Sequence, residues 1–460
     1  MSLAAAEGFS KLVTFAAFAY LARVLGSETY GYIEFAGAVI MCASLIVDQG
    51  FSAFGAREIA KAPAETGRLT AEIVTARVLL AFGGYLMVVL FALLADRGPL
   101  VLRLLLVYGL SLWGLPLLLQ WVFQGHEKMH LVALAQMIRQ TIFVLMVFAF
   151  VRGPGNALMV AWAEVSAVLA AAMFCVWTYR RNFKSTKPIR PVISSQTFRG
   201  GVPIGLSQMF WVIKMFGATL ILGLIATPQS VGLFAGAQRI LVALHTFVWL
   251  YYFNLLPSLS RAWQHADGDF VRLIDRSQPG LAWIAVAVAI AWVAFSNVVM
   301  EFVYGPEFRS AGTVLALFAG VWAMALIDGH YRYALIAAGR VKAEMLTSAL
   351  GAVLALILVP VGYQRFGISG AAAAIVIAEA GIWLSAWLCG RKMLGLKNNI
   401  RHLRLPCIVG LLVLGAYWLI PPSARNARLT LAVLLPAVLA FLLDHTARIR
   451  VRQLFALLRT

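Results

Sequence analysis

Charged residues are scarce in this chain, and acidic residues are the scarcest of them. Only 12% of the 460 residues are charged, and Asp and Glu together number 19. Soluble domains carry about a quarter charged residues, so the composition excludes a cytosolic enzyme, a nucleic-acid-binding module and a disordered tail. Apolar residues fill the sequence instead: 62% are hydrophobic, and the mean hydropathy is +0.86. This composition indicates a membrane protein.

Cysteine is also rare, which limits the chemistry that the chain can perform. The four cysteines are Cys42, Cys175, Cys389 and Cys407. All four lie within or at the ends of apolar runs, and their spacing matches neither a metal site nor a disulfide framework. We interpret them as small apolar side chains, and we expect no metal, no cofactor and no catalytic residue.

Long apolar runs predict an all-α polytopic membrane protein. A membrane-spanning helix needs about 20 mostly apolar residues, and the sequence predicts fourteen such helices. Their ranges are 3–23, 31–56, 72–95, 100–123, 131–151, 156–179, 201–226, 230–256, 280–303, 311–337, 343–363, 368–389, 405–420 and 429–444. The predicted parts are an N-terminal six-helix bundle (1–179), a basic cytoplasmic linker (180–199), a C-terminal six-helix bundle (200–392), and two extra helices with a basic cytoplasmic tail (393–460).

Basic residues are distributed very unequally between the two sides of these helices. The even-numbered connections and the C-terminal tail hold 24 of the 38 Lys and Arg residues, and the odd-numbered connections hold eight. Lys and Arg near helix ends favour the cytoplasmic side. The asymmetry predicts that both termini are cytoplasmic. It also explains most of the net charge of +19 without nucleic acid as a partner.

Residues recur at a nearly constant offset between the two predicted bundles. The offsets are 201 to 204 residues in the first helices and 214 to 215 residues further along. The pairs are Lys11 with Lys214, Gly31 with Gly232, Arg57 with Arg261, Arg68 with Arg272, Lys128 with Lys342, and Glu164 with Glu379. An even number of helices in each half gives both halves the same orientation. We therefore predict a parallel repeat related by a pseudo-twofold axis along the membrane normal, with a central cavity between the bundles.

Six basic residues remain inside the predicted helices. They are Lys11, Arg77, Arg139, Lys214, Arg239 and Arg332. A basic residue at the centre of a membrane helix costs about 2.5–3.5 kcal/mol, so each must reach the headgroups, pair with an acid, or face water. All six are candidates to line a cationic cavity and bind substrate. For Arg77 we favour a side chain that reaches the headgroups. For Arg332, a structural pair with Asp328, four residues earlier, explains the charge as well as a functional site does.

Acidic residues within the helices offer a second interpretation of these cations. The candidates for charge partners or ion-coupling groups are Asp48, Glu164, Asp328 and Glu379. Burial of Arg139, Lys214 and Arg239 against such acids is the structural alternative to a cationic cavity. If the cavity is cationic, its ligand is an anion, because arginine matches phosphate oxygens with paired hydrogen bonds.

Several motifs along the whole chain resemble those of the bacterial polysaccharide exporters. They are Leu21–Gly26 followed by Tyr30-Gly31, Asp48–Phe51 followed by Ala56–Ile59, Tyr304–Phe308, Gly339-Arg340, and Gly367–Ala372 continuing to Glu379. The resemblance implies the oligosaccharide flippase (Wzx-like) branch of the fold shared with multidrug exporters and the lipid II flippase. It further implies a lipid-linked oligosaccharide on undecaprenyl pyrophosphate as cargo, alternating access as mechanism, and membrane lipids, a polysaccharide polymerase and assembly proteins as partners. In this family the first and seventh helices face the cavity, which favours Lys11 and Lys214.

Two other functions compete with this one. A multidrug or cation antiporter of the same fold needs acidic cavity walls, whereas the basic residues inside these helices equal or outnumber the acids. A membrane-embedded glycan polymerase or ligase needs acid–base groups on a sizeable external face. The predicted external loops are at most about ten residues long and carry no paired carboxylates or histidine clusters.

Overall fold

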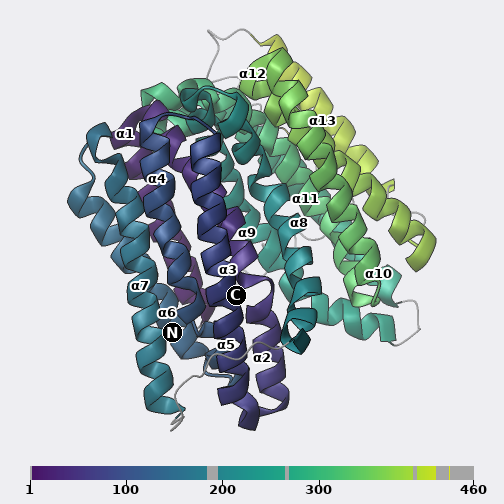
Figure 1. Cartoon of the computed structure of the whole chain (residues 1–460). Helices are drawn as coiled ribbons and strands as arrows, with labels where there is room; N and C mark the ends of the chain where they lie inside the picture. The colour runs from purple at the N-terminus through teal and green to yellow at the C-terminus, as the bar shows by residue number, and fades with distance from the viewer. Residues whose placement is uncertain (1–2, 184–194, 265–268, 397–400, 421–434, 436–460) are drawn as a thin grey trace, which may run out of the picture. The chain divides into compact units, whose positions relative to one another are not determined.

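A computed structural model describes residues 3–183, 195–264, 269–396, 401–420 and 435 (Figure 1). Apart from short 3-10 turns, the regular elements in these ranges are α-helices. They are α1 (Leu3–Asp48), α2 (Phe51–Lys61), α3 (Thr66–Leu94), α4 (Pro99–Gly109), α5 (Gln120–Gly125), α6 (Met129–Phe150), α7 (Ala157–Asn182), α8 (Ser195–Ile225), α9 (Pro228–Gln264), α10 (Asp269–Tyr304), α11 (Gly312–Ala337), α12 (Val341–Leu394) and α13 (Arg401–Leu419).

Two of these helices are each a pair of helices joined across a kink. α1 bends at Gly26, whose φ is 75°, and α12 bends at Gly367, whose φ is 62°. Glycine adopts positive φ without the penalty that a Cβ brings. Both kinks fall between two predicted spans, so the first thirteen predicted helices have counterparts in the described ranges. The fourteenth, 429–444, lies outside the described residues.

The fourth predicted helix differs from the expectation of one continuous span. α4 ends at Gly109 and is followed by two 3-10 turns, Leu110–Trp113 and Leu115–Leu117, before α5 begins at Gln120. Pro116 has no backbone N–H to donate, and its ring disfavours a helical turn before it. Its position explains the interruption, which the apolar pattern alone does not reveal.

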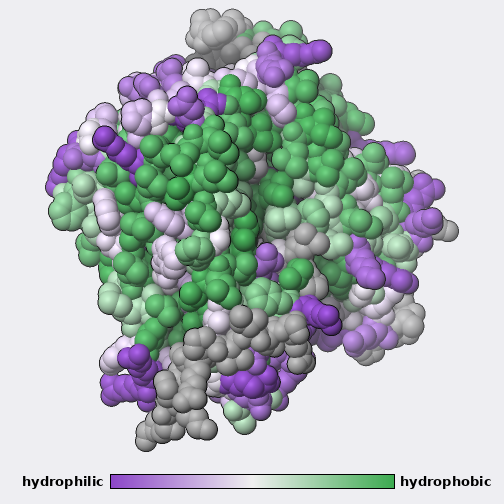
Figure 2. Space-filling view, in the orientation of Figure 1, coloured by the Kyte–Doolittle hydropathy of each residue, from purple (hydrophilic) through white to green (hydrophobic). Residues whose placement is uncertain are grey.

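The outer faces of the helices are apolar, as a lipid environment requires. On α3, Phe82, Leu86, Leu90 and Leu93 are all at least half exposed and recur at helical spacing. Where Figure 2 shows α3, α4, α6 and α7 of the first unit, apolar residues dominate the middle and hydrophilic residues gather at the upper and lower ends. Nine helical segments in the described ranges are long and apolar enough to cross a membrane.

The chain divides into two compact units, residues 1–235 and 236–460. One buried cluster of the first unit joins Phe51 and Phe54 of α2 to Trp121 of α5 and Tyr179 of α7. One buried cluster of the second unit joins Leu259 of α9, Ile274 of α10 and other apolar residues of α10 to α12. The boundary at 235 lies within α9, after the predicted linker, because α8 packs on α1 and α2 of the first unit.

His126 lies in the turn between α5 and α6, outside the candidate spans. Its Nε2 atom is 2.8 Å from Thr66 Oγ1, and that hydroxyl donates to the Pro63 carbonyl oxygen at 2.6 Å. The imidazole N–H therefore donates to Thr66. Burial of the ring, and to a lesser degree the charge of Lys128, lowers the pKa of His126 below its ordinary value of 6.5.

This lowered pKa predicts a loss of stability in acid. The unfolded chain binds the proton more readily than the folded chain, so the stabilisation is complete above the ordinary pKa and declines as pH falls below it. We expect the Tm in detergent to fall between about pH 7 and about pH 5, and His126→Gln to reduce this fall. The matched control is His130→Gln, at an exposed histidine one turn further on; an equal effect of both substitutions would contradict the assignment.

Candidate functional site

An ion pair links the fifth and sixth predicted spans of the first unit. Arg139 on α6 donates from Nη2 to Glu164 Oε1 on α7 at 2.5 Å. The two side chains remain 39% and 23% exposed, so the pair is not enclosed in a dry helix junction. On the next residue of α6, the Gln140 amide donates to Thr14 on α1. These four residues, Arg139, Gln140, Glu164 and Thr14, form the N-terminal polar cluster.

Lys11 lies on α1 three residues before Thr14. Positions three apart share a helix face, so Lys11 occupies the face of α1 that carries Thr14 toward α6. Its side chain lies outside the described residues. A role of Lys11 in binding therefore stays a prediction.

Lys214 and Arg239 are both partly exposed. Lys214 lies near the middle of α8, nine residues from both Gly205 and Gly223. Arg239 follows the buried Gln238 on α9. Lys214 belongs to the first unit and Arg239 to the second. Both side chains interact with other residues of the protein.

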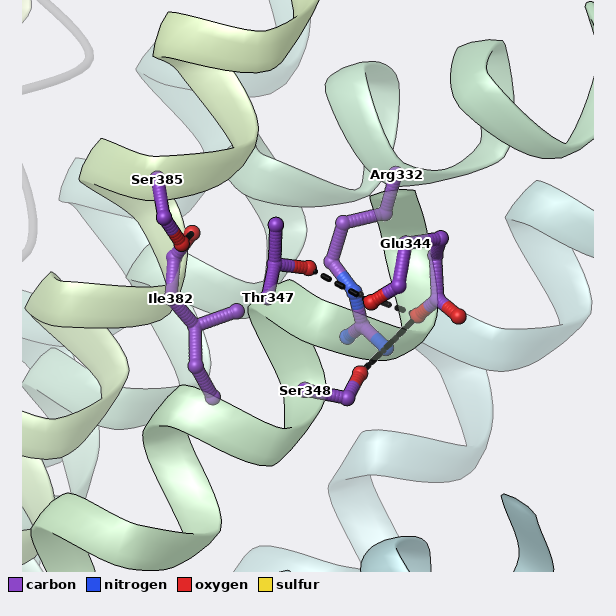
Figure 3. A network of polar contacts seen from close by, with 6 residues as sticks. All are labelled: Arg332, Glu344, Thr347, Ser348, Ile382 and Ser385. Atoms are coloured by element: carbon purple, nitrogen blue, oxygen red, sulfur yellow. Dashed lines mark hydrogen bonds and ion pairs between the residues drawn. The ribbon is translucent and has the colours of Figure 1, made fainter. Parts of the chain in front are cut away.

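The second unit contains an ion pair that the sequence spacing did not predict. Arg332 on α11 donates to Glu344 Oε1 on α12 from Nη2 at 2.5 Å and from Nε at 3.1 Å. Ser348, one turn further on α12, accepts from Arg332 at 3.0 Å and donates to the same carboxylate oxygen at 3.0 Å (Figure 3). Arg332, Glu344 and Ser348, with Asp328 and Glu379, form the C-terminal polar cluster.

The C-terminal polar cluster contains more acids than bases. Asp328 and Glu379 interact electrostatically with Arg332, together with Glu344. Asp328 is completely buried and Glu379 is 2% exposed. Three carboxylates thus interact electrostatically with one guanidinium.

Arg77 differs from the expectation that it reaches the headgroups. It is 5% exposed, pairs with Asp48 at the end of α1, and donates to Ser52 on α2 at 3.2 Å. Ser52 in turn donates to Asp48 at 2.7 Å. The expectation is wrong because the start of α3 packs against the junction of α1 and α2, which encloses the guanidinium. A role of Arg77 or Asp48 in substrate binding stays a prediction.

Glu344 is the main residue of the site that the sequence analysis missed. Glu344 is the fourth residue of α12 and follows the basic Lys342 by two positions. An acid this close to a helix end resembles an ordinary surface charge. The signal that would have revealed it is its spacing from Ser348, which places both side chains on one helix face. No group of three or more His, Cys, Asp or Glu within the described residues has a metal-binding arrangement.

The comparisons with known proteins agree with this architecture. The model of the family described as "Polysaccharide biosynthesis protein" matches residues 1–263. The chain belongs to this family. The resemblance to bacterial polysaccharide exporters is therefore confirmed.

Two curated relatives of this family member are named as candidate O-antigen transporters. One, from Escherichia coli (strain K12), is 23% identical over 321 residues, which are 68% of this chain and 77% of the relative. The other, from Shigella dysenteriae, is 27% identical over 187 residues, which are 39% of this chain and 46% of the relative. Both names describe transporters and not enzymes.

Solved structures show the same fold. The lipid II flippase MurJ in an inward closed conformation matches with a TM-score of 0.73 at 10% identity, covering 96% of this chain and 98% of MurJ. An inward-facing multidrug resistance transporter of the MATE family, in the MOP superfamily, matches with a TM-score of 0.69 at 13% identity, covering 85% and 96%. These likenesses confirm the predicted all-α polytopic membrane fold.

Proposed function

We propose that this protein flips an undecaprenyl-pyrophosphate-linked oligosaccharide across the bacterial inner membrane for polysaccharide biosynthesis. The proposal is supported by membership of the polysaccharide biosynthesis family, by relatives named as candidate O-antigen transporters, and by the fold shared with a lipid II flippase. A polysaccharide polymerase and assembly proteins are the partners expected to receive the glycan.

The chemical basis of the proposal is a set of cationic residues within the apolar helices. Lys214 and Arg239 lie on long apolar helices and are partly exposed, so a ligand can reach both side chains. A pyrophosphate offers several acceptor oxygens to such side chains. We assign the head group to these two residues, with Lys11 and Arg139 as further contacts. Alternating access between the two six-helix bundles then moves the head group, while the polyprenyl chain stays in lipid.

The C-terminal polar cluster supplies the coupling step of this proposal. Binding of a proton or a sodium ion by Asp328 or Glu379 reduces the negative charge around Arg332 and so changes how tightly α11 and α12 are held together. The proposed orientation, with both termini in the cytoplasm, rests on the distribution of Lys and Arg.

The experiment that tests the proposed function is deletion of the gene followed by mass spectrometry of the membrane lipids. We expect a sugar–pyrophosphate–polyprenol to accumulate on the cytoplasmic leaflet and surface polysaccharide to be lost. Complementation with the wild-type gene should reverse both effects. Loss of the polysaccharide without such an intermediate would contradict a flippase and favour a step in glycan synthesis or polymerisation.

The Arg139–Glu164 pair predicts a separation of stability from transport. In the swapped variant Arg139→Glu with Glu164→Arg, the ion pair is kept but the cation moves from α6 to α7. We expect the protein level to equal the wild type, because a half-exposed pair contributes only about 0–1 kcal/mol, and transport to fall about tenfold if one phosphate contact is lost. Full transport by the swapped variant would make the pair purely structural.

A further inference from the structure

Two glycines of the first unit form an unusually close helix crossing. A Cβ added to Gly31 on α1 would overlap the Pro228 carbonyl oxygen and lie 2.8 Å from the Gly232 nitrogen. A Cβ added to Gly232 on α9 would overlap the Ser27 carbonyl oxygen and lie 3.0 Å from the Gly31 nitrogen. Only glycine at both positions permits this approach of the two backbones. The four residues Ser27, Gly31, Pro228 and Gly232 form the glycine crossing.

The glycine crossing is reciprocal, and its symmetry follows the internal repeat. Ser27 and Pro228 are 201 residues apart, as are Gly31 and Gly232. Each glycine meets the carbonyl of the residue that precedes its counterpart by four positions. The contact therefore repeats itself when the two halves of the sequence are exchanged, which places it on the local pseudo-twofold axis. Small residues four apart on parallel helices allow such close crossings in membranes.

A second contact lies one turn further along α1, against α8. The side chain of Phe35, one turn after Gly31 on α1, packs directly on Gly223 of α8, where a Cβ would lie 2.5 Å or less from three ring carbons. Phe35 is 3% exposed, and Tyr30 beside the crossing is fully buried. Together, the crossing and the Phe35–Gly223 contact leave no room for additional side-chain atoms next to two consecutive turns of α1.

A pocket of mixed polar and apolar lining borders these contacts. It has a volume of about 280 Å³ and reaches the exposed Asp96 and the partly exposed Arg97 in the turn between α3 and α4. Its other walls include Gly31, Phe35 and Gly223. Residues of the crossing and of the Phe35–Gly223 contact thus form part of the pocket wall. The charge distribution assigns this end of the first unit to the outside of the membrane.

We propose that the glycine crossing, backed by Phe35 on Gly223, is the outer closure of the transport path. The two helices are in contact while the path is closed to the outside, and they part when it opens outward. This inference rests on the proposed function. It names the residues that are in contact in the outward-closed state and apart in the outward-open state. A Cβ at either glycine removes the closed arrangement without touching a cargo residue, so such variants shift the population toward the outward-open state.

Cysteine accessibility tests this inference without any cargo. The four native cysteines are first replaced. Thr219→Cys then places a thiol on α8 one turn before Gly223, at a position that is 2% exposed. Intact cells are treated with a membrane-impermeant maleimide. We expect Gly31→Ala or Gly232→Ala to raise the labelling rate of this thiol about tenfold, because the rate follows the population of the outward-open state and we expect that population to rise about tenfold.

Gly37→Ala is the matched control, because Gly37 lies on the same helix and a Cβ there meets nothing within 4 Å. It should leave the labelling rate unchanged. Unchanged labelling in folded Gly31→Ala and Gly232→Ala proteins would overturn the proposal. Because the readout requires no substrate, increased labelling in a protein that moves no lipid-linked glycan would refute the proposed function and retain the closure.

If the alanine variants do not accumulate in the membrane, a cross-linking experiment tests the proposal instead. Glu28 and Gln229 are exposed, lie 201 residues apart, and follow the first residues of the crossing by one position. Cysteines at both positions, joined by a short bifunctional thiol reagent that reducing agents cleave, hold α1 and α9 together. We expect the cross-link to stop transport and reduction to restore it. Normal transport with the cross-link in place would make the crossing a fixed pivot and overturn its role as a closure.

Discussion

Replacing Lys214 and Arg239 together by alanine is expected to abolish transport while the protein still accumulates in the membrane. Each side chain is assigned to the pyrophosphate, and a hydrogen bond to a charged group contributes about 1.5–3 kcal/mol. The loss of two such contacts weakens binding by about 3–6 kcal/mol, which is at least about a hundredfold in affinity. The measurement is complementation of the deletion strain, scored as surface polysaccharide per unit of protein in the membrane.

Charge-preserving variants separate recognition from packing at the same positions. Lys214→Arg with Arg239→Lys keeps both positive charges, and we expect it to retain most of the transport. Arg272→Ala is the matched control for the loss of a cation, because Arg272 is 62% exposed at the start of α10. Wild-type transport by the double alanine variant would remove the chemical basis for a phosphorylated cargo.

The membrane-spanning helices could be predicted from the sequence because apolar runs directly record contact with lipid. The helix ends were less predictable, since α8 begins at Ser195 and α9 continues to Gln264, beyond the apolar runs. Backbone hydrogen bonds continue a helix into water without help from hydropathy. The apolar pattern thus marks the part of a helix that lies in lipid and not the whole helix.

The partners of the buried cations could not be predicted to the same extent. Spacing along one helix favoured Asp328 as the partner of Arg332, and the two do interact electrostatically. The hydrogen bonds instead go to Glu344, which is twelve residues away and on the next helix. Only the turn between α11 and α12 brings that carboxylate into reach, and a turn geometry is not visible in helical periodicity.

Depth along a helix was an equally incomplete guide for Arg77. Its distance from the helix end is short enough for a side chain to reach the headgroups. In the structure, the junction of α1 and α2 covers this part of α3, and Asp48 is the nearer anion. The sequence reveals how deep a residue lies, whereas packing decides which neighbour it meets.

Breaking the Arg332–Glu344 pair is expected to destabilise the second unit strongly. Arg332 is 19% exposed and Glu344 is 15% exposed, so Glu344→Gln leaves a guanidinium largely out of water with a weaker acceptor. Removing one partner of a buried pair costs about 3–5 kcal/mol. Reversible unfolding in detergent measures this loss, with Ser385→Ala as control, because the Ser385 hydroxyl bonds only within its own helix, to the Ile382 carbonyl oxygen (Figure 3).

The apolar double variant distinguishes the pair from its surroundings. Arg332→Met with Glu344→Leu removes both charges and keeps the side-chain volume close to the original, but it leaves the buried Asp328 and Glu379 without a guanidinium. We therefore expect it to be no more stable than Glu344→Gln alone and to lose ion-coupled transport. If Glu344→Gln unfolds like the Ser385→Ala control, the pair contributes little, and Arg332 must be stabilised mainly by the two buried acids.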